Sequence, residues 1–461
     1  LRPKDAAPNT FLETVYAFEA YGRMSRITDS RVGSNPATID DYQFAYDQFG
    51  NLAEERYDRP DGNAGTANAG DAFAYDRFHR LQEAVLGASA LPYTPGIDSF
   101  VRRLTYGLDH AGNRTSTTST DASGTIATQT YLTTANRYTQ VQPLPATYLY
   151  DDRGNLIFDG THYYVFDFKD RLSEIWLLVE DEVPAEQTEL ESAGAFEDQQ
   201  VRTALLSPGP LQAVRQRVLA GLRQAPRTSA DLERMQEYGV LTEPVLLPYG
   251  TPIETSGGIQ YAQQTTTEAT SLQLIALYAY DAYDRRVGRL VVADASTYLH
   301  VYDGWREIQE LKVDPSTGAK LPYKEFAWGG RLDELVAYRR NDASFGQPAQ
   351  WTTYHTTQCG HECVLAVLDS NGVLVERGVY DPYGGLSVYG PNEAPLGGEF
   401  TSGLPMAWNG LRREAEVPLV YMRHRHYSPG LGRFVSIDPL GVYEDSLNFG
   451  NVVGYAGNNP L

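Results

Sequence analysis

FAYDQFGNL, residues Phe44 to Leu52, is one copy of a degenerate unit that decides the fold of this chain. The unit reads aromatic, any residue, aromatic, acid, two residues, Gly or Asp, Asn or Arg, and then an apolar residue. Further copies are YAFEAYGRM from Tyr16, FAYDRFHRL from Phe73, YLYDDRGNL from Tyr148, YVFDFKDRL from Tyr164, YAYDAYDRR from Tyr278 and, more weakly, HVYDGWREI from His300. The 32 Tyr of the chain are therefore positional residues of a repeat.

Each copy predicts a strand, a tight turn and the start of another strand. Aromatics two residues apart face one side of a strand, and the acid that follows can accept hydrogen bonds from turn amides. Gly-Asn or Asp-Arg supplies left-handed or tight backbone. Unrelated hairpins would not need paired aromatics each time, whereas cross-strand aromatic ladders do, at about 0.2 to 1 kcal/mol per pair. The repeat predicts an all-β fold, a spiralling β-ribbon built like a solenoid.

One region breaks the repeat, between Val179 and Leu247. Aromatic residues thin out there, and PLQAVRQRVLAGLRQA from Pro210 and SADLERMQEYGV from Ser229 have helical spacing, with a Pro start and a Ser cap. The preceding stretch is acidic and polar. These features predict a helical insertion with an acidic lead. Its charged helices are most simply a solvated face, and an interaction arm is the alternative.

The charge balance restricts the classes of partner. The chain has 38 Lys and Arg against 59 Asp and Glu, a formal net charge of -21, which repels phosphate backbones and argues against a nucleic-acid partner. Basic cargo is favoured instead. No apolar run approaches the roughly 18 residues of a membrane span. The N-terminal LRPKDAAPNTF lacks the apolar core of a signal peptide and is read as an internal start.

The two cysteines exclude a disulfide framework. Cys359 and Cys363 lie in QCGHEC, with His361 between them and His355 nearby, so thiolate and imidazole ligands for a metal are conceivable. Structural zinc usually takes its ligands from two separated pairs, and there is no second cysteine pair. A loop with two buried thiols is the favoured interpretation, and we expect neither a metal nor a cofactor.

The last 41 residues, Tyr421 to Leu461, concentrate turn signals. Pro429-Gly430, Gly432 and the Asp438-Pro439-Leu440-Gly441 unit force the chain to double back. This brings Arg425 and Asp438 close together in the prediction. An ordinary turn Asp, a surface Arg, and two histidines (His424 and His426) on alternate faces of a strand are the simpler alternative.

From Val379 onward, VYDPYGGL, WNGLRREAEVPLVYMRHRHYSPGLGRFVSIDPLG and VGYAGNNPL follow one another. In this order they resemble the core domain that closes the Rhs and YD-repeat proteins, a family that includes the C components of Tc toxins. With the repeats, the resemblance spans most of the chain. It implies a YD-repeat ribbon over 1–178 and 248–378, the insertion over 179–247 and the core domain over 379–461. Rhs family members are hollow shells, so we expect a shell or part of one.

The resemblance also implies a function: a shell segment that encapsulates a C-terminal polymorphic toxin and helps to deliver it, with aspartic-type self-cleavage in the parent chain. Matched by motif, the catalytic residues fall on Arg425 and Asp438. Two carboxyl groups that share a proton can hydrolyse a peptide bond, and a guanidinium can polarise the carbonyl. The family's second Asp-Pro-x-Gly-Leu is absent before Leu461, so we expect this chain to be inactive as given and its parent to turn over at most once.

The implied partners are the toxin cargo and other shell components or an injection machine, and the implied location is secreted or delivered. An acidic lumen would suit a basic toxin. The alternative is an extracellular adhesive YD-repeat module that binds carbohydrate or protein through exposed Tyr-rich faces. A glycan hydrolase with an acid pair is disfavoured because the acids are spread over repeated turns.

Overall fold

The computed structural model describes residues 11–32, 36–58, 70–143, 146–180, 252–255, 258–261, 270–293, 296–315, 317–441 and 450–461. In these ranges the regular structure consists of antiparallel β-strands and short 3-10 turns, which confirms the all-β prediction. The predicted helical insertion lies outside the described residues from 181 onward, and Val179 and Glu180 belong to a strand. In the described part of the chain, no helix has the length and apolar character needed to cross a membrane.

The N-terminal sheet has eleven strands in sequence order, so that each strand pairs with the next one in the chain. Its strands are β1 (Phe11–Phe18), β2 (Met24–Val32), β3 (Ala37–Tyr46), β4 (Leu52–Asp58), β5 (Gly70–Tyr75), β6 (Leu81–Ala88), β7 (Arg102–Leu108), β8 (Arg114–Asp121), β9 (Ile126–Thr134), β10 (Arg137–Gln142) and β11 (Ala146–Thr147). This meander is the ribbon that the repeats predict.

A second sheet of fifteen strands continues the ribbon. Its strands are β12 (Leu149–Tyr150), β13 (Leu156–Phe158), β14 (His162–Phe166), β15 (Leu172–Glu180), β18 (Thr270–Tyr280), β19 (Arg286–Val291), β20 (Ser296–Asp303), β21 (Arg306–Val313), β22 (Lys320–Trp328), β23 (Leu335–Asn341), β24 (Trp351–Gln358), β25 (Val364–Leu368), β26 (Leu374–Tyr380), β27 (Leu386–Tyr389) and β28 (Pro395–Gly397). Since β15 pairs directly with β18, the ribbon is continuous across the region between them. A separate pair is formed by β16 (Pro252–Thr255) and β17 (Gly258–Tyr261), and a small four-stranded sheet by β29 (Arg412–Arg413), β30 (Val420–Met422), β31 (Arg425–Ser428) and β32 (Arg433–Phe434).

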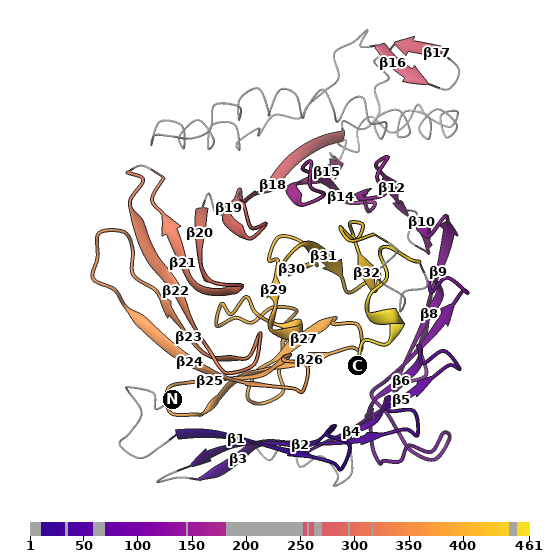
Figure 1. Cartoon of the computed structure of the whole chain (residues 1–461), viewed down its shortest axis with the longest axis vertical. Coiled ribbons are helices and arrows are strands. Elements are labelled where there is room, and N and C mark those ends of the chain that lie inside the picture. Colours follow the sequence, from indigo (N-terminus) through magenta and orange to yellow (C-terminus); the bar gives the residue numbers. More distant parts are fainter. Residues whose placement is uncertain are drawn as a thin grey trace, which may run out of the picture.

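The ribbon curves round until its first strands lie beside β25 and β26 (Figure 1). Ile39 of β3 packs against Ala366 and Leu368 of β25. Asp40 of the same strand pairs with Arg377 of β26 at 2.5 Å, with both side chains buried. These contacts close the ribbon into a circuit.

The turns between the strands follow the repeat unit. In FAYDQFGNL, Asp47 Oδ1 accepts the N–H groups of Phe49 at 2.8 Å and Asn51 at 2.9 Å, and Asp47 N–H donates to Asn51 O at 2.9 Å. Gly50 takes the left-handed conformation at φ +93° that the fourth turn position requires. The predicted roles of the acid and of the Gly-Asn pair are therefore confirmed.

The second aromatic of the unit couples each turn to the one before it. Its hydroxyl donates to the backbone carbonyl of the first residue after the preceding turn. The bonds run from Tyr46 to Met24 (2.7 Å), from Tyr75 to Leu52 (2.8 Å), from Tyr280 to Leu172 (2.6 Å), from Tyr302 to Arg286 (2.9 Å) and from Tyr380 to Val364 (2.9 Å). Tyr338 and Tyr354 stack across strands with ring centroids 5.0 Å apart, but they lie outside the repeat copies. The copies' own aromatics face other residue types, as Phe44 faces Glu55 and Tyr278 faces Arg289, so the predicted aromatic ladder is not formed by them.

The space inside the circuit is occupied by the chain's own C-terminal segment, residues 400–441 and 450–461 (Figure 1). Val417, Leu419 and Val435 of this segment belong to one buried cluster with Leu172 and Ile175 of β15. The small sheet β29–β32 thus fills the centre, and the ribbon's inner face packs on it as a core.

Candidate functional site

The C-terminal segment carries the residues that the sequence marks as functional. Strands β30 and β31 form a hairpin in which Val420 pairs with Tyr427 and Met422 with Arg425. Arg423 between them has φ +60°, a tight hairpin turn. The hairpin sets Arg425 at the start of β31.

Arg425 and Asp438, the two predicted catalytic residues, are in contact, with Arg425 Nη2 2.9 Å from Asp438 Oδ2. The guanidinium carbon of Arg425 also lies 3.5 Å from the ring centroid of Phe434. Asp438 Oδ1 accepts the N–H of Leu440 at 2.9 Å, and the N–H of Gly441 donates to Asp438 O at 2.9 Å, which closes the Asp-Pro-Leu-Gly turn. Their side chains are 19% and 13% exposed, so the pair is partly shielded from water.

The Asp438 turn is anchored on both sides. Asp438 N–H donates to Val452 O at 2.9 Å, and Ile437 N–H donates to Asn155 Oδ1 of a repeat turn at 3.2 Å. The N–H group of Leu440 and the guanidinium of Arg425 together fix the orientation of the Asp438 carboxyl group. Aspartic-type hydrolysis needs a second carboxyl group, so the catalytic roles of Arg425 and Asp438 stay a prediction.

The two histidines that flank Arg425 differ in burial. His424 is exposed and contacts Trp305 edge-on, with ring centroids 5.1 Å apart. His426 is 2% exposed, and its Nε2 lies 3.3 Å from Glu414 Oε1. His424 lies in the hairpin turn and only His426 lies in β31, so the two are not successive faces of one strand as the simpler alternative has them.

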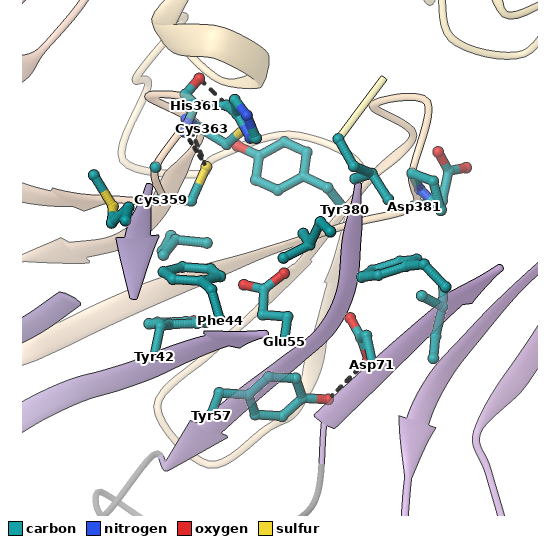
Figure 2. Close-up of a pocket in the computed structure, with 18 of the residues that line it drawn as sticks. Tyr42, Phe44, Glu55, Tyr57, Asp71, Cys359, His361, Cys363, Tyr380 and Asp381 are labelled. Carbon is teal, nitrogen blue, oxygen red and sulfur yellow. Dashed lines mark hydrogen bonds between the residues drawn. The ribbon is translucent and has the colours of Figure 1, made fainter. Parts of the chain in front are cut away.

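A cavity of about 380 Å³ lies where β2–β5 meet the turns after β24 and β26 (Figure 2). It is lined by aromatic rings and carboxylates, and by Cys359, His361 and Cys363. In the described part of the chain, these three side chains do not bring their ligand atoms within 4.8 Å of one another. Burial lowers the pKa of His361. The geometry therefore gives no support to a metal site at this turn.

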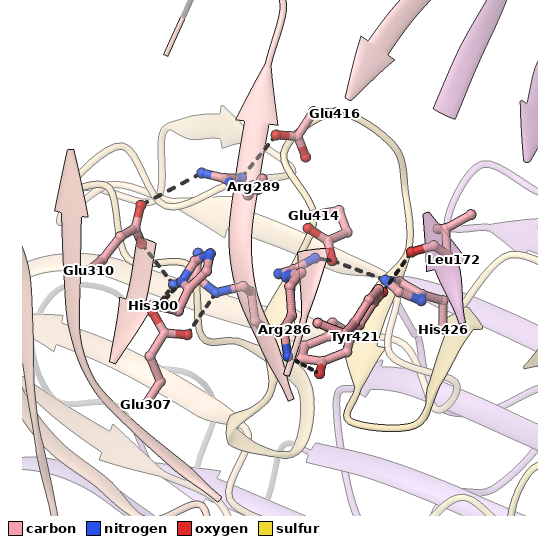
Figure 3. A network of polar contacts seen from close by, with 12 residues as sticks. Leu172, Arg286, Arg289, His300, Glu307, Glu310, Glu414, Glu416, Tyr421 and His426 are labelled. Atoms are coloured by element: carbon pink, nitrogen blue, oxygen red, sulfur yellow. Dashed lines mark hydrogen bonds and ion pairs between the residues drawn. The ribbon is translucent and has the colours of Figure 1, made fainter. Parts of the chain in front are cut away.

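A buried ion cluster joins the C-terminal segment to the ribbon (Figure 3). Its members come from β19–β22 and from residues 412–426, and they are Arg286, Arg289, His300, Glu307, Glu310, Lys324, Arg412, Glu414, Glu416 and His426. Arg286 and Glu414 are in direct contact and fully buried. Arg412 donates to Glu307 Oε1 at 2.5 Å and to Glu310 Oε2 at 2.7 Å. Each buried charge thus has an opposite charge beside it.

The cluster shifts the pKa values of its members. Burial alone would raise the pKa of Glu307, but Arg412 holds it at about 2. Burial acts in the same direction on Glu414, yet Arg286 keeps the pKa of that carboxyl well below its ordinary value. Burial lowers the pKa of Lys324 to about 8. Glu307, Glu310 and Glu414 therefore remain ionised in the folded protein far below neutral pH, whereas burial raises the pKa of Glu416.

His300, Glu307 and Glu310 offer three ligand atoms within 4.8 Å of one another. This donor set suits a divalent cation in principle. Here the guanidinium of Arg412 bonds both carboxylates. We therefore interpret the group as part of the ion cluster.

The sequence analysis missed this cluster. Arg412 and Glu414 stand in the run LRREAEVPL, two residues apart and followed by apolar residues. This spacing is the one local signal of the cluster in the sequence. It places both charged side chains on the same face of a strand, and charged residues on a buried face are rare unless they are paired with opposite charges. Their partners lie more than 100 residues earlier in the chain, at Glu307 and Arg286.

No protein-family model matches this chain. Among curated proteins it is similar to the toxin protein Tse5 of Pseudomonas aeruginosa, with 26% identity over 321 residues, which are 64% of this chain and 22% of that protein. It is also similar to the tRNA3(Ser)-specific nuclease WapA of Bacillus spizizenii, 26% identical over 40% of this chain and 7% of that protein. The probable deoxyribonuclease RhsA of Dickeya dadantii is 27% identical over 40% of this chain and 12% of that protein. The matches thus span at most 22% of these relatives' lengths.

Solved structures show the same fold. The crystal structure of TcdB2–TccC3 matches 97% of this chain and 18% of its own, with a TM-score of 0.59 and 15% identity. The Tc holotoxin pore of Photorhabdus luminescens matches 98% of this chain and 18% of its own, with a TM-score of 0.59 and 16% identity. The chain therefore has Rhs and Tse5 toxin proteins as relatives, and its fold resembles part of the TcdB2–TccC3 structure.

Proposed function

We propose that this chain is the closing part of a β-ribbon shell that encapsulates a toxin and helps to deliver it. Its toxin relatives and its fold support this role. The observation that carries the proposal is the position of the C-terminal end. Leu461 packs against Leu81, Leu104 and Tyr106 on the ribbon's inner face, and the C-terminus lies inside the circuit (Figure 1). A polypeptide joined at Leu461 would begin inside the shell.

The end of the chain is held there by repeat turns. Asn459 Nδ2 donates to Asn51 Oδ1 at 3.1 Å, and Asn458 Nδ2 donates to Gly112 O at 3.0 Å. Asn51 and Gly112 belong to two different repeat turns of the N-terminal sheet. In this role the C-terminal segment, which we assign to the predicted core domain over 379–461, closes the shell and positions the start of the cargo.

The proposal includes self-cleavage in the parent chain, with Asp438 and Arg425 as catalytic residues. Asp438, oriented by Leu440 N–H and by Arg425, would share a proton with a second carboxyl group and activate water. The guanidinium of Arg425 would stabilise the oxyanion of the tetrahedral intermediate. This step would also need a second acid and a scissile bond, which the motif match does not assign to any residue of this chain.

The test is expression of the parent chain with its natural continuation, followed by intact mass measurement. We expect the wild-type chain to be cut and Asp438→Asn to remain intact, with cleavage slowed at least about 1000-fold. The matched control is Asp121→Asn. Asp121 also accepts the N–H group two residues on, from Ser123 at 2.9 Å, but lies in an exposed turn of the ribbon. If the wild-type chain stays intact, or if Asp438→Asn is cut as fast as Asp121→Asn, the cleavage role is wrong.

A second candidate is an adhesive module that binds protein or carbohydrate. The observation that favours it is a set of exposed aromatic side chains at the tips of the repeat turns. They are Tyr21, Phe49, Phe78, Phe168, Tyr283 and Trp305. Rings on successive turn tips of one ribbon offer a contact surface. Loss of glycan-array or cell binding in Phe49→Ser/Tyr283→Ser, with unchanged cleavage of the parent chain, would support this candidate over the shell role.

A further inference from the structure

The two cysteines occupy defined positions of a repeat turn. Cys359 N–H donates to Cys363 O at 2.9 Å, and Glu362 N–H donates to Cys359 O at 3.1 Å. The Asp47 turn has the same two bonds, at 2.9 and 3.1 Å. Glu362 has φ +60°, the left-handed backbone of the fourth turn position. Cys359 is therefore the first residue of a repeat turn, and Cys363 is the fifth.

The first and fifth side chains touch in six other turns of this kind. A carboxylate at the first position bonds an amide or guanidinium at the fifth. The pairs are Asp47–Asn51 (2.7 Å), Asp76–Arg80 (2.7 Å), Asp109–Asn113 (2.8 Å), Asp151–Asn155 (2.9 Å), Asp167–Arg171 (2.7 Å) and Asp281–Arg285 (2.8 Å). In the turn that starts at Cys359, the two side chains placed this way are thiols. The Cys359 thiol lies beside the Cys363 thiol, as two sulfurs that form a disulfide must.

The turn treats the two sulfurs differently. Cys359 Sγ accepts the N–H groups of His361 at 3.3 Å and Cys363 at 3.2 Å. In the Asp47 turn the same two N–H positions bind a carboxylate oxygen. The two N–H groups therefore hold the Cys359 sulfur in one place, and Cys359 is the more exposed thiol of the pair. On this geometry Cys359 is the attacking sulfur.

Cys363 is the second thiol. It is 3% exposed, and burial raises the pKa of its thiol well above the ordinary value, as does the Cys359 thiol beside it. Its Sγ lies 3.7 Å from Asn409 Oδ1 and accepts the Asn409 N–H at 3.5 Å. Asn409 in turn donates to Tyr455 Oη at 2.7 Å. Cys363 therefore links the turn to the C-terminal segment, and it can react with a neighbouring sulfur more readily than with reagents in solution.

Small molecules have space to reach the pair. Both cysteines line the cavity of about 380 Å³ between the turn and β2–β5 (Figure 2). Cys359 is partly exposed, whereas Cys363 is buried. A reagent in the cavity would therefore meet Cys359 first.

We propose that Cys359 and Cys363 form a redox-reactive dithiol that low-molecular-weight disulfides convert into a disulfide within the turn. The Cys359 thiolate attacks one sulfur of the reagent, the reagent's S–S bond breaks, and one thiolate leaves. Cys363 then loses its proton and attacks the Cys359 sulfur, so that the mixed disulfide breaks and a second reagent thiolate leaves. Two protein thiols are oxidised to one disulfide, and one reagent disulfide is reduced to two thiols, whose sulfurs take up the two protons that the protein thiols lose.

The test uses the full chain under native conditions with oxidised glutathione as the probe, an alkylating quench and intact mass. The wild-type protein should lose the mass of two hydrogen atoms, with no adduct and no alkylation. Cys363→Ser should keep one glutathionyl group on Cys359, because no second thiol displaces it. Cys359→Ser should react at least about tenfold more slowly than Cys363→Ser, since its remaining thiol is buried. A stable glutathione adduct on the wild-type protein, or equal rates for the two single variants, would overturn the proposal.

A transplanted pair separates the turn geometry from mere closeness in sequence. Asp369 and Val373 hold the first and fifth positions of another repeat turn, in which Asp369 N–H donates to Val373 O at 2.8 Å. In a background without Cys359 and Cys363, Asp369→Cys/Val373→Cys should also form an internal disulfide. Accumulation of glutathione adducts on this variant would show that these turn positions do not bring two thiols together, and the proposal would fail.

Discussion

At the scale of single residues, tyrosine at the second aromatic position of the repeat adds a hydrogen bond that the phenylalanine of other copies cannot make. Tyr75 Oη donates to Leu52 O at 2.8 Å, across to the strand that follows the preceding turn. Tyr75→Phe should lower the free energy of unfolding by about 1 kcal/mol, the net value of such a hydrogen bond. Urea denaturation measures the change. Tyr283→Phe is the control, because Tyr283 is 72% exposed and should shift nothing; equal shifts for the two variants would contradict the assigned role.

Asp29 provides a second prediction at this scale. It is 2% exposed and lies directly opposite Asp40 on the neighbouring strand. Burial, together with the charge of Asp40, raises the pKa of Asp29 to about 7. The folded protein thus keeps a proton that the unfolded chain releases near pH 4, so stability falls as the pH rises from about 4 to 7. Asp29→Asn should raise the free energy of unfolding at pH 8 by about 1 to 3 kcal/mol and have little effect at pH 4.

Urea midpoints at the two pH values test this effect. Asp121→Asn is the control in an exposed turn and should shift neither midpoint. A destabilised Asp29→Asn at pH 8 would mean that the carboxylate of Asp29 is stabilised in the folded protein, contrary to the direction of its pKa shift.

At the scale of elements, the fifth residue of a repeat turn determines which other segment of the chain the turn contacts. Asn113 donates to Asp109 Oδ2 at 2.8 Å within its turn, and its Oδ1 accepts Arg433 Nη2 at 2.9 Å and Asn451 Nδ2 at 3.1 Å from the C-terminal segment. Arg171 at the same position reaches the next turn instead. Asn at this position therefore fastens the C-terminal segment to the ribbon.

Asn113→Ala should cost roughly 2 to 4 kcal/mol, because it leaves several buried polar groups without a partner. We expect protease cleavage to begin in residues 430–461 before it reaches the ribbon. Val373→Ala is the matched control, since Val373 holds the same turn position, is 50% exposed and should change stability by less than about 0.5 kcal/mol. Cleavage that starts in the ribbon strands of Asn113→Ala would refute the fastening role.

How far the sequence predicts these elements depends on the distance between the interacting residues. The turns follow from local chemistry, since Asp47 and Asn51 are four residues apart. The turn signals between Arg425 and Asp438 likewise predict their approach, although the Asp438 turn is also anchored on Asn155, far away in the sequence. The contact between Arg412 and Glu307 spans 105 residues. Nothing local distinguishes its partners from the many solvated charges of this chain, so the ion cluster could not be predicted.

At the scale of the whole molecule, the closed ribbon and the C-terminal segment inside it stabilise each other. The ribbon's inner face is covered by the C-terminal segment, and that segment has only a small sheet of its own. A four-stranded sheet of two- to four-residue strands is too small to be stable alone. The expected shell is therefore closed, in this part of the chain, by packing and by the buried ion cluster.

The ion cluster should make this closure sensitive to acid. Arg412 holds the pKa of Glu307 at about 2, and the pKa values of Glu310 and Glu414 are also lowered. These carboxylates bind protons near pH 4.3 in the unfolded chain but only at lower pH in the folded protein. The stability that they contribute is therefore present above about pH 4.3 and is lost as the pH falls toward 2. Hydrogen exchange at pH 5, 3.5 and 2.5, corrected for intrinsic rates, should show residues 412–434 losing protection before β1–β3.

Glu414→Gln distinguishes the ion cluster from general acid unfolding. It leaves the fully buried Arg286 without its carboxylate partner, so at pH 7 residues 412–434 should lose protection by about 3 to 5 kcal/mol. Between pH 5 and 2.5 the decrease in protection should then be smaller in the variant than in the wild-type protein. The reason is that the variant lacks one of the carboxylates with a lowered pKa. Glu325→Gln, which removes a carboxylate from the exposed pair with Arg339, should leave both measurements unchanged. If acid exposes β1–β3 and residues 412–434 together in all three proteins, the closure does not depend on the cluster, and apolar packing alone holds the C-terminal segment in the circuit.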